Sequence, residues 1–482
     1  MSRISPARIP PDVIALCRKL VEAGYSAFVV GGAVRDLLLY DANSGQQAKD
    51  FDIATSAHPE DVVRIFGARR TIPTGIAHGT VTVLCDRLPT EPGATEAPEP
   101  GSAEHKHRHV EVTTFRGETG YSDGRRPDRI EFIADLVEDL RRRDFTINAI
   151  AYDPLTDTLH DPFDGQGDLG RRLLRAVGDP AQRFAEDGLR LLRAVRFAAK
   201  LNFQIEEATR RAFAPALPTL RKVSRERVRD ELLRLLGAAH PDIGLMHLFE
   251  PTLDAARPDP AARFAPEHSL LSVALPEVCA LLAGDVGAAL RWMALIMRCP
   301  PALRTAALLW PLRRAAPDAM STFLKDPRRL SNLLDERLKL PLAERQHLAA
   351  LLLLPELAYD ASAPWPAPQL RRLLAAQPAA LLDDWLALRE HELRVEQASE
   401  PADQLRALQL RIAEERARRP ALSIAELALT GQDVLSLLKI PPGPRVGQVL
   451  RHLLECVLDD PQANQRDWLL SEAARFLQAT AG

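Results

Sequence analysis

The chain has 482 residues, a formal net charge of −3, and average proportions of hydrophobic (46%) and charged (26%) residues. This length predicts a globular protein with two to four packed units, and the small net charge gives no overall indication of nucleic acid binding. The five cysteines lie far apart without C-x-x-C spacing, which argues against a disulfide framework and against a zinc site. The chain has neither a long apolar N-terminal core nor an uncharged apolar run of 18 residues. We therefore expect a cytoplasmic protein with no membrane span.

The first 150 residues combine short β-rich runs with helices. Residues Ser26 to Val30 are predicted to form a strand that ends at Gly31-Gly32, with a helix in "AVRDLLL" and a second strand in "FDIAT". "PEDVVRIF" begins with proline and acids, as helices often do. "GTVTVL" (79–84) and "HVEVTTF" (109–115) alternate and are rich in β-branched residues, so we expect neighbouring antiparallel strands.

Residues 87–108 separate those two predicted strands. They consist largely of Pro, Glu, Ala and Gly without an apolar period, which indicates a flexible insertion. The "HKHRH" run at the end of this segment could bind a metal, but a solvated tract is the favoured interpretation.

From about Asp168 the apolar period becomes 3.6, and helices are expected to the C-terminus. The clearest amphipathic helix is "DGLRLLRAVRFAAKLNF". Between Arg171 and Arg229, 15 Lys and Arg residues face 6 Asp and Glu, a net charge of +9. This segment is either a local phosphate-binding surface or a solvated helix face.

Asp50 and Asp52 are the first candidate catalytic residues. Side chains two apart on a strand share one face, so these carboxylates could hold a pair of divalent cations, as phosphoryl transfer requires. Glu111, in an alternating strand, is a candidate third carboxylate, and Gly31 and Gly32 would let the backbone approach a phosphate. A D-x-D pattern alone is common in loops, and Glu111 alone could simply face solvent.

"RRRDFTINAI" (141–150) places three arginines and Asp144 beside a β-branched run, and arginine is the natural partner of phosphate or ribose oxygens. In "EDGLRLLRAVRF", Asp187, Arg190, Arg193 and Arg196 are spaced by three and predict one polar stripe on a helix. A surface salt-bridge ladder is the plain alternative. A carboxylate only accepts hydrogen bonds and a guanidinium only donates them. One Asp and one Arg could therefore select cytosine and adenine, which both have an amino group beside an unprotonated ring nitrogen.

A series of strings between about Phe28 and Leu236 resembles the class II tRNA nucleotidyltransferases and bacterial poly(A) polymerases, a branch of the polymerase β-like superfamily. The strings include "VVGGAVRDLLL", "KDFDIATSAHPEDV", "RRRDFTINAIAYDP" and "FAEDGLRLLRAVRF". A weaker likeness returns at residues 429–470, and residues 240–420 carry no motif that we match. The resemblance implies an α+β fold: a head with a small mixed sheet (1–155), then an elongated, all-helical neck (156–240), body (241–400) and tail (401–482) that bind tRNA.

The resemblance also implies individual roles. Asp50 and Asp52 would hold two catalytic Mg²⁺ ions. Arg35 would contact the triphosphate, Arg143 and Asp144 the ribose, Asp187 and Arg190 the base, and Arg193 and Arg196 the phosphates. The full set of expected nucleotide-binding residues is Gly31, Gly32, Arg35, Arg143, Asp144, Asn148, Asp187, Arg190, Arg193 and Arg196.

"TGIAHGTVTV" resembles the tRNA-directed members, and residues 116–127 look like the flexible loop that members adding only CC lack. The sequence therefore predicts template-independent addition of CCA, or of its terminal A, to tRNA from CTP and ATP with release of pyrophosphate. A poly(A) polymerase and a non-catalytic RNA-binding protein are the alternatives. The sequence gives no oligomeric state.

Overall fold

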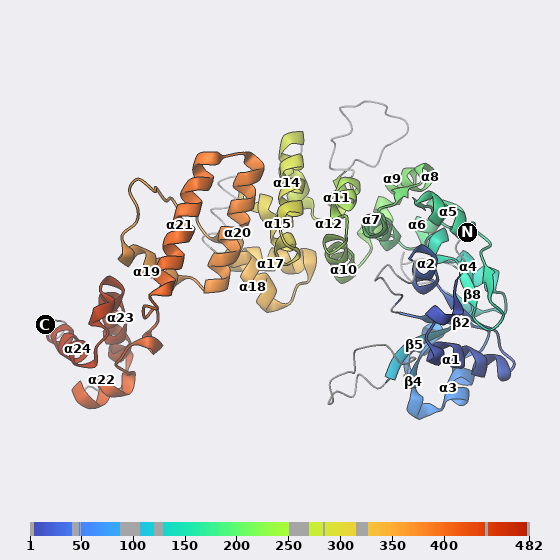
Figure 1. Ribbon diagram of the computed structural model, residues 1–482, viewed down its shortest axis with the longest axis horizontal. Coiled ribbons are helices and arrows are strands. Elements are labelled where there is room, and N and C mark those ends of the chain that lie inside the picture. Colours follow the sequence, from blue (N-terminus) through green and yellow to red (C-terminus); the bar gives the residue numbers. More distant parts are fainter. Residues whose placement is uncertain are drawn as a thin grey trace. The chain divides into compact units, whose positions relative to one another are not determined.

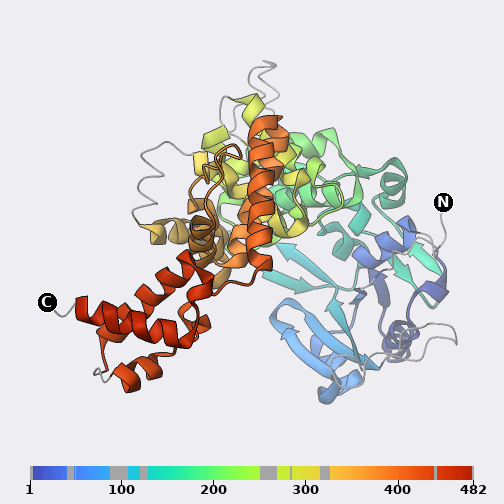
Figure 2. The same cartoon turned by 60° about the vertical axis from the view of Figure 1, so that its left-hand side comes forward.

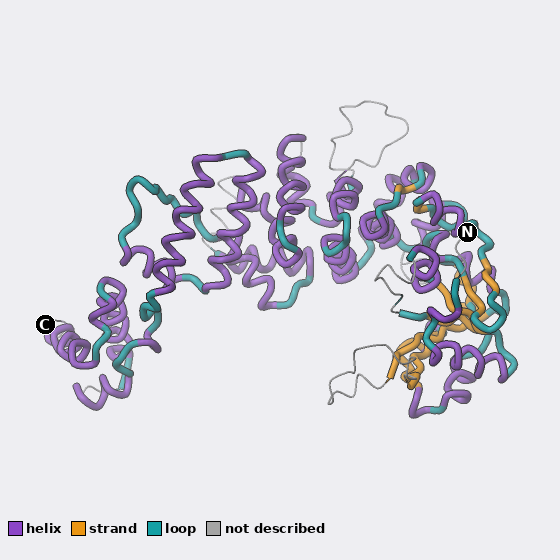
Figure 3. The backbone as a smooth tube through the Cα atoms, viewed as in Figure 1, coloured by secondary structure: helices purple, strands orange, loops and turns teal. Residues whose placement is uncertain are grey.

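The computed structural model describes residues 4–40, 48, 50–86, 107–119, 129–249, 269–282, 285–314, 326–438 and 442–479. The chain divides into two compact units, residues 1–284 with 337–339 and residues 285–336 with 340–482. Figures 1 and 2 show the ribbon in two views, and Figure 3 shows that the strands lie towards the N-terminal end of the chain. No described helix combines the length and the hydrophobicity that crossing a bilayer requires.

Seven strands of the first unit form a mixed sheet in the order β3-β4-β5-β2-β1-β8-β9. Their bounds are β1 Ala27–Val30, β2 Asp52–Thr55, β3 Thr71–Gly75, β4 Thr80–Asp86, β5 His107–Thr114, β8 Ala151–Asp153 and β9 Thr158–His160. Strands β2 and β5 are parallel, and the other neighbours in this sheet are antiparallel. The mixed sheet and the antiparallel pairing of β4 with β5 confirm the prediction.

Two further strand pairs lie outside the main sheet. Strands β6 (Arg116–Thr119) and β7 (Arg129–Phe132) pair antiparallel. Strands β10 (Leu173–Leu174) and β11 (Gln204–Ile205) form a two-residue parallel ladder. The short ladder corrects the expectation that the segment after the head is purely helical.

The predicted insertion at 87–108 ends two residues too late. His107 and Arg108 belong to β5, where they lie opposite Asp86 and Cys85 of β4. His107 lies 3.0 Å from Asp86, and the Arg108 Nε donates to Asp12 Oδ2 at 2.9 Å. Three of the five residues of the "HKHRH" run therefore belong to a strand, whereas residues 87–106 lie outside the described residues.

Thirteen described helices of the first unit surround and follow the sheet (Figure 1). They are α1 Pro11–Glu22, α2 Gly32–Leu39, α3 Pro59–Phe66, α4 Leu136–Arg141, α5 Gly165–Arg171, α6 Pro180–Glu186, α7 Leu189–Leu201, α8 Glu207–Arg211, α9 Phe213–Arg221, α10 Arg225–Leu236, α11 Pro241–Phe249, α12 Leu270–Ala274 and α13 Pro276–Leu282. Helices α2 and α3 are those predicted from "AVRDLLL" and "PEDVVRIF". A core cluster joins the sheet to α4: Val30, Ala54, Phe115, Leu140, Ala149, Ala151 and Val177.

The helix predicted to begin at Asp187 begins two residues later. Helix α6 ends at Glu186, Asp187 has an extended backbone (φ −143°, ψ 106°), and α7 starts at Leu189. A Cβ on Gly188 would lie 2.4 Å from the backbone nitrogen of Leu220, so only glycine lets α9 pack this closely against the break. The apolar stripe of α7 is buried, as predicted: Leu189, Leu192 and Val195.

The described part of the second unit contains helices and connections but no strand, which confirms the helical prediction for this region. Its helices are α14 Val286–Arg298, α15 Arg304–Leu309, α17 Pro327–Leu338 (whose last two residues belong to the first unit), α18 Leu342–Leu353, α19 Ala367–Ala376, α20 Ala379–Glu396, α21 Ser399–Ala417, α22 Gly431–Leu438, α23 Pro444–Asp459 and α24 Arg466–Ala479.

A buried ion pair ties three helices of the second unit together. Arg371 on α19 donates to Glu415 on α21 at 2.7 Å, and both side chains are almost fully buried. The same guanidinium donates to the backbone carbonyls of Leu458 and Asp459 at the end of α23, at 2.6 and 2.8 Å. Since removing one member would leave a buried charge, this pair fixes the packing of these helices.

Candidate active site

The candidate site forms where three neighbouring strands of the sheet begin or end. Strand β1 ends at Val30, which lies opposite Asp52 on β2 and Ala151 on β8. The next residue, Gly31, donates its backbone N–H to the Ile150 carbonyl at 3.4 Å. Residues far apart in the sequence, namely the glycine turn, the paired aspartates and the segment before β8, therefore meet at one edge.

The three candidate carboxylates lie on one side of this edge. Phe51 is buried, as predicted, whereas Asp50 and Asp52 are exposed and line the same cavity. Asp50 precedes β2 and is not part of it. Asp52 and Glu111 are partners across the parallel pair β2 and β5, so their side chains share a face of the sheet. Glu111 is exposed and does not line the cavity.

The charges near Asp52 make it a fitting ligand for a cation. The Asp52 side chain is exposed to solvent in the cavity, but the surrounding protein partly desolvates its carboxylate and so raises its pKa. Repulsion from Glu111 and Asp50 raises the pKa further, to about 6, although Arg143 opposes the shift. A divalent cation would relieve this repulsion, and carboxylate oxygens are the ligands that hard cations prefer. Within the described residues the three carboxylates do not all lie within 4.8 Å of one another, so a shared ion would have to draw them together.

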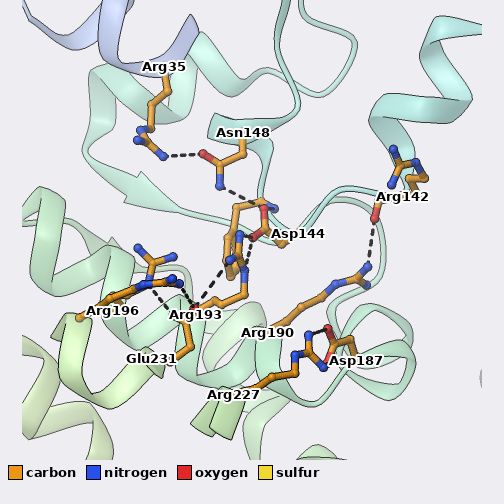
Figure 4. A network of polar contacts seen from close by, with 12 residues as sticks. Arg35, Arg142, Asp144, Asn148, Asp187, Arg190, Arg193, Arg196, Arg227 and Glu231 are labelled. Atoms are coloured by element: carbon orange, nitrogen blue, oxygen red, sulfur yellow. Dashed lines mark hydrogen bonds and ion pairs between the residues drawn. The ribbon is translucent and has the colours of Figure 1, made fainter. Parts of the chain in front are cut away.

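A chain of hydrogen bonds joins four residues that line the cavity (Figure 4). Asn148 accepts from Arg35 Nη1 at 2.7 Å and donates to Asp144 Oδ1 at 3.0 Å. Asp144 Oδ2 accepts from both Nε and Nη2 of Arg193, at 2.9 and 2.7 Å. Burial by itself would raise the pKa of Asp144, but Arg193 and the Asn148 hydrogen bond outweigh it and lower the pKa to about 2. Asp144 is therefore ionised at neutral pH and holds Arg193 in place.

Arg143 lies close to the glycine turn. Its Nη1 is 3.1 Å from the position that a Cβ on Gly31 would occupy. Its Nη2 contacts Asp139 at 3.4 Å, while its Nε is buried without a hydrogen-bond partner among the described residues. A polar group of a bound ligand would satisfy this donor, because a buried N–H without a partner is costly.

Asp187, one of the two residues expected to select the base, lies at the break between α6 and α7. Its Oδ1 accepts from the backbone N–H of Leu189 at 3.0 Å and so caps α7. Its Oδ2 accepts from Arg227 Nη2 on α10 at 2.8 Å. The carboxylate is thus held in one orientation from two sides, and Asp187, Leu189 and Arg227 all line the cavity.

Arg190, the other residue, is buried and held by neighbouring backbone. Its Nη1 donates to the Arg183 carbonyl at 2.8 Å and to Glu186 at 2.5 Å, and its Nη2 donates to the Arg142 carbonyl at 3.1 Å. These bonds, and not one to the Asp187 carboxylate, fix the position of the guanidinium. Among the described residues they use three of the five N–H groups of the guanidinium, which leaves two for a ligand.

Arg193 and Arg196 differ in position. Arg193 lines the cavity, and Arg196 does not. The Nε of Arg196 donates to Glu231 at 2.5 Å, and its guanidinium lies over the Phe197 ring at 4.1 Å. Glu231 on α10 is buried and also lies 3.8 Å from Arg193. Arg196 therefore supports the arginine beside the cavity, while its predicted phosphate contact stays a prediction.

The cavity has a volume of about 490 Å³, within the range of small-molecule sites. Six arginines and four aspartates contribute to its lining, so the cavity offers many charged donors and a smaller cluster of anionic ligands. It is lined by Gly31, Gly32, Arg35, Asp50, Asp52, Arg142, Arg143, Asp144, Asn148, Asp187, Leu189, Arg190, Arg193, Phe197 and Arg227. Such a site suits a polyanionic nucleotide together with a cation.

The sequence matches three known domain families. Residues 27–175 match the poly(A) polymerase head domain, residues 202–254 the "RNA and SrmB-binding site of polymerase A", and residues 370–473 domain 2 of tRNA nucleotidyltransferases. The third match begins at residue 370, so part of the region in which the sequence analysis found no motif is recognisable.

Solved structures resemble the chain over its whole length. The CCA-adding enzyme of Bacillus stearothermophilus, solved in complex with CTP, is 30% identical, with a TM-score of 0.61 over 98% of this chain and 100% of that chain. The protein belongs to the class II tRNA nucleotidyltransferase and poly(A) polymerase family. The Thermotoga maritima CCA-adding enzyme complexed with tRNA is 18% identical with a TM-score of 0.57, and it shares the fold.

Curated relatives in this tRNA nucleotidyltransferase family match over a shorter stretch. The CCA-adding enzyme of Lactobacillus johnsonii is 45% identical over 222 residues, which are 46% of this chain and 49% of the relative. That of Levilactobacillus brevis is 45% identical over 253 residues, 52% of this chain and 57% of the relative. The chain therefore aligns with about half the length of these curated relatives.

Sequence reasoning missed several residues of this cavity. Arg142, Phe197 and Arg227 line it, and Glu231 holds Arg196 from behind. Arg227 and Glu231 are four residues apart on α10, so they share one helix face. That spacing inside the basic segment was a usable signal, but nothing in it indicated which charged groups of α7 would lie opposite.

Replacing Gly31 with alanine should impair the candidate site. The backbone of Gly31 has φ +73°, a conformation that residues other than glycine rarely adopt. In addition, the Cβ of an alanine at this position would lie 3.1 Å from Arg143 Nη1. We expect a loss of about 1–3 kcal/mol in the free energy of unfolding and a weaker affinity for nucleoside triphosphate. Gly67→Ala is the matched control, since Gly67 also has a positive φ but nothing within 4 Å of its Cβ position. Equal triphosphate affinity in the two variants would contradict the close approach.

Proposed function

We propose that the protein is a template-independent tRNA nucleotidyltransferase, which adds CCA to the 3′ end of tRNA from CTP and ATP and releases pyrophosphate. Addition of the terminal A alone is the narrower form of this proposal. The observation that carries it is one cavity lined by Asp50 and Asp52 together with Asp187 and Arg190. Relatives named CCA-adding enzymes support the choice of substrates.

Asp50 and Asp52 would hold divalent cations, with Glu111 on the neighbouring strand as a further carboxylate. We propose Mg²⁺, because the donors are hard carboxylate oxygens whose mutual repulsion a cation would relieve. When bound, such ions would favour ionisation of the attacking 3′-hydroxyl and neutralise charge on the phosphates. Reaction at the α-phosphate would then proceed by in-line displacement of pyrophosphate.

The arginines of the cavity would bind and orient the triphosphate. Arg193 is immobilised by Asp144, and Arg35 by Asn148 and the adjacent Asp36. Donors that are already fixed lose little freedom when they bind phosphate, which favours a single orientation of the leaving group. Arg143 would contact a ribose or phosphate oxygen; its Nη1 beside Gly31 and its buried, unpartnered Nε support this role.

Base selection would rest on Asp187 and Arg190. The Asp187 carboxylate can accept a hydrogen bond from the amino group of cytosine or adenine, and Arg190 has two donors left for the unprotonated ring nitrogen. Uracil and guanine offer an oxygen acceptor beside a ring N–H, so each would face groups of the wrong kind. The cost of such mismatched buried groups supplies the discrimination.

We also propose that the helical segments beyond residue 240, in the body (241–400) and tail (401–482), bind tRNA. A domain match to tRNA nucleotidyltransferases at residues 370–473 supports this division. The cytoplasm is the proposed location, because the five cysteines are all free, and thiols persist in a reducing compartment.

The deciding experiment supplies tRNAs that end before CCA, after the first C, or after CC, with CTP and ATP given singly and together. Full CCA addition predicts that every substrate is completed when both nucleotides are present. An A-adding enzyme would extend only the tRNA that ends in CC. Long A tails on unstructured RNA would favour a poly(A) polymerase, and no incorporation at all would favour a non-catalytic RNA-binding protein.

Replacing Asp187 with asparagine should weaken selection of the base. The amide keeps the shape but adds N–H donors, so the preference for CTP over UTP, measured as a ratio of kcat/KM, should fall by about 10- to 100-fold. The capping bond to Leu189 can survive through the amide oxygen. Primer extension with each nucleoside triphosphate given alone measures this ratio.

Asp179→Asn is the matched control for this prediction. Asp179 caps α6 through Ala181 at 3.0 Å, as Asp187 caps α7 through Leu189 at the same distance, but Asp179 does not line the cavity. Both variants therefore change a helix cap, and only Asp187→Asn changes the cavity. An equal change in base preference in the two variants would refute the proposed role of Asp187.

A further inference from the structure

A cluster of three potential metal ligands lies far along the chain from the candidate active site, between helices α23 and α24. His452 and Cys456 lie one turn apart on α23, and Glu472 lies on α24. The His452 Nε2 is 3.0 Å from Glu472 Oε1 and 3.7 Å from the Cys456 Sγ. Within the described residues, it is the only group of three such side chains whose ligand atoms all lie within 4.8 Å.

The two separations measured from His452 are close to those around a tetrahedral ion, and the third, between Cys456 and Glu472, is under 4.8 Å. With Zn–N and Zn–O distances of about 2.1 Å and a Zn–S distance of about 2.3 Å, neighbouring ligand atoms of a tetrahedral site lie about 3.3–3.6 Å apart. The two observed separations from His452 Nε2, 3.0 and 3.7 Å, differ from these values by only a few tenths of an ångström. A small rotation of the side chains would accommodate the ion.

The surroundings hold the ligands in position. The second oxygen of Glu472 accepts from Arg475 at 2.8 Å, and the ring of Phe476 stacks on His452 at 4.3 Å. Beneath them, a hydrophobic core packs α23 against α24: Leu453, Val457, Leu469 and Ala473 are among its buried members. Partners that orient a ligand raise metal affinity, and two of the three ligands, His452 and Glu472, have such partners.

We propose that His452, Cys456 and Glu472 bind one divalent cation of borderline softness, of the Zn²⁺ class, and leave a fourth position for water or an external donor. Nitrogen and sulfur ligands distinguish this site from the oxygen-only carboxylates of the head. The thiol releases one proton to solvent on binding. The wide spacing of the cysteines in the sequence argued against a zinc site. Folding nevertheless brings Cys456 together with His452 and Glu472, which lie 20 positions apart in the chain.

The test uses the full-length protein with excess Mg²⁺ to occupy the carboxylates of the head, and Co²⁺ as a spectroscopic probe for Zn²⁺. We expect one Co²⁺ per chain, with an intense near-ultraviolet band from thiolate-to-cobalt charge transfer and visible bands typical of four ligands. Added Zn²⁺ should displace the cobalt and abolish both sets of bands. Cys456→Ser should remove the near-ultraviolet band, and His452→Gln or Glu472→Gln should weaken affinity at least about tenfold.

His347→Gln is the matched control. His347 Nε2 contacts Asp384 at 2.8 Å on two packed helices of the same unit, which reproduces the histidine–carboxylate pair. No third ligand completes a metal-binding group there among the described residues. This variant should keep the full cobalt spectrum. Absence of a thiolate band in the parent protein, its persistence in Cys456→Ser, or equal losses in His347→Gln and His452→Gln would overturn the proposal. Circular dichroism of each variant distinguishes loss of a ligand from loss of fold.

Discussion

Asp52→Asn should lower nucleotide transfer by at least about 10³-fold while leaving tRNA binding within about twofold of the parent. A lost metal ligand removes several kcal/mol of transition-state stabilisation, and each 1.4 kcal/mol is tenfold in rate. The asparagine keeps the shape of the side chain beside Asp50. Single-turnover incorporation of CTP or ATP measures the rate, and filter binding of labelled tRNA measures the affinity.

The same substitution should not destabilise the metal-free protein. The pKa of Asp52 is raised to about 6, from 3.8 in the unfolded chain, so ionisation of this group costs stability. Below about pH 4 the group is protonated in both states, and the cost appears as the pH rises through 6. Asp52→Asn removes the charge, and the variant should therefore melt at the same or a higher temperature than the parent at pH 8 in EDTA.

Asp86→Asn serves as the control for both measurements. Asp86 is an exposed acid on the same sheet, paired with Arg70 at 2.7 Å, and it does not line the cavity. Its replacement should leave transfer unchanged. Residual activity of Asp52→Asn near that of Asp86→Asn would refute the metal assignment, and a large fall in melting temperature would contradict the predicted repulsion.

Arg193→Met should destabilise the first unit by about 3–5 kcal/mol. Asp144 is buried, and Arg193 supplies two of its hydrogen bonds, so the substitution leaves a charge without its main partner. Methionine retains much of the apolar stem of the arginine, which confines the change to the guanidinium. The affinity for triphosphate should fall as well, because Arg193 lines the cavity.

The distribution of tryptophan makes this effect measurable in the full chain. All five tryptophans, at positions 292, 310, 365, 385 and 468, belong to the second unit. Tryptophan fluorescence therefore follows unfolding of the second unit, whereas far-ultraviolet circular dichroism follows both. In Arg193→Met, the dichroism transition of the first unit should move to a lower temperature. The fluorescence transition, which reports the second unit, should stay where it is in the parent.

Acid titration gives a further check on the same pair. The pKa of Asp144 is lowered to about 2, from 3.8 when unfolded, so its contribution to stability is present above about pH 4 and is lost as the pH falls towards 2. The parent and Arg193→Met should converge in stability across that window. Arg210→Ala is the control: it breaks a surface pair with Glu207 and should lower the free energy of unfolding by less than about 1 kcal/mol. An equal loss in Arg193→Met would contradict the assignment of Asp144 and Arg193 as a buried pair.

Much of the fold was predictable from local pattern. The alternation in residues 79–84 and 109–115 predicted two neighbouring strands, because burial on one face requires a period of two. The start of α7 was not predictable in the same way. Apolar periodicity continues through Gly188, and the break is imposed by α9, whose backbone at Leu220 packs against this glycine.

The candidate site was predictable as a set of residues but not as a set of contacts. Asp50 and Asp52 could be recognised in sequence because their two-residue spacing is a local feature, and because a glycine pair precedes them at Gly31 and Gly32. The partner of Asp187 is Arg227, 40 residues later, and the partner of Asp144 is Arg193, 49 residues later. Such pairs depend on how helices pack. Asp187, Arg190, Arg193 and Arg196 were expected to form one polar stripe, but each of them is held by different partners.

Asp86 and His107, the residues on either side of 87–106, lie opposite each other at the ends of β4 and β5. Glu111 lies four residues further along β5, with its register fixed by Thr82 and Asp52 on either side. Insertions or deletions between the two ends add only loop-closure entropy, which grows slowly with length, and leave the strand register unchanged. This segment is therefore a natural place to graft a label or an affinity tag without displacing the carboxylates.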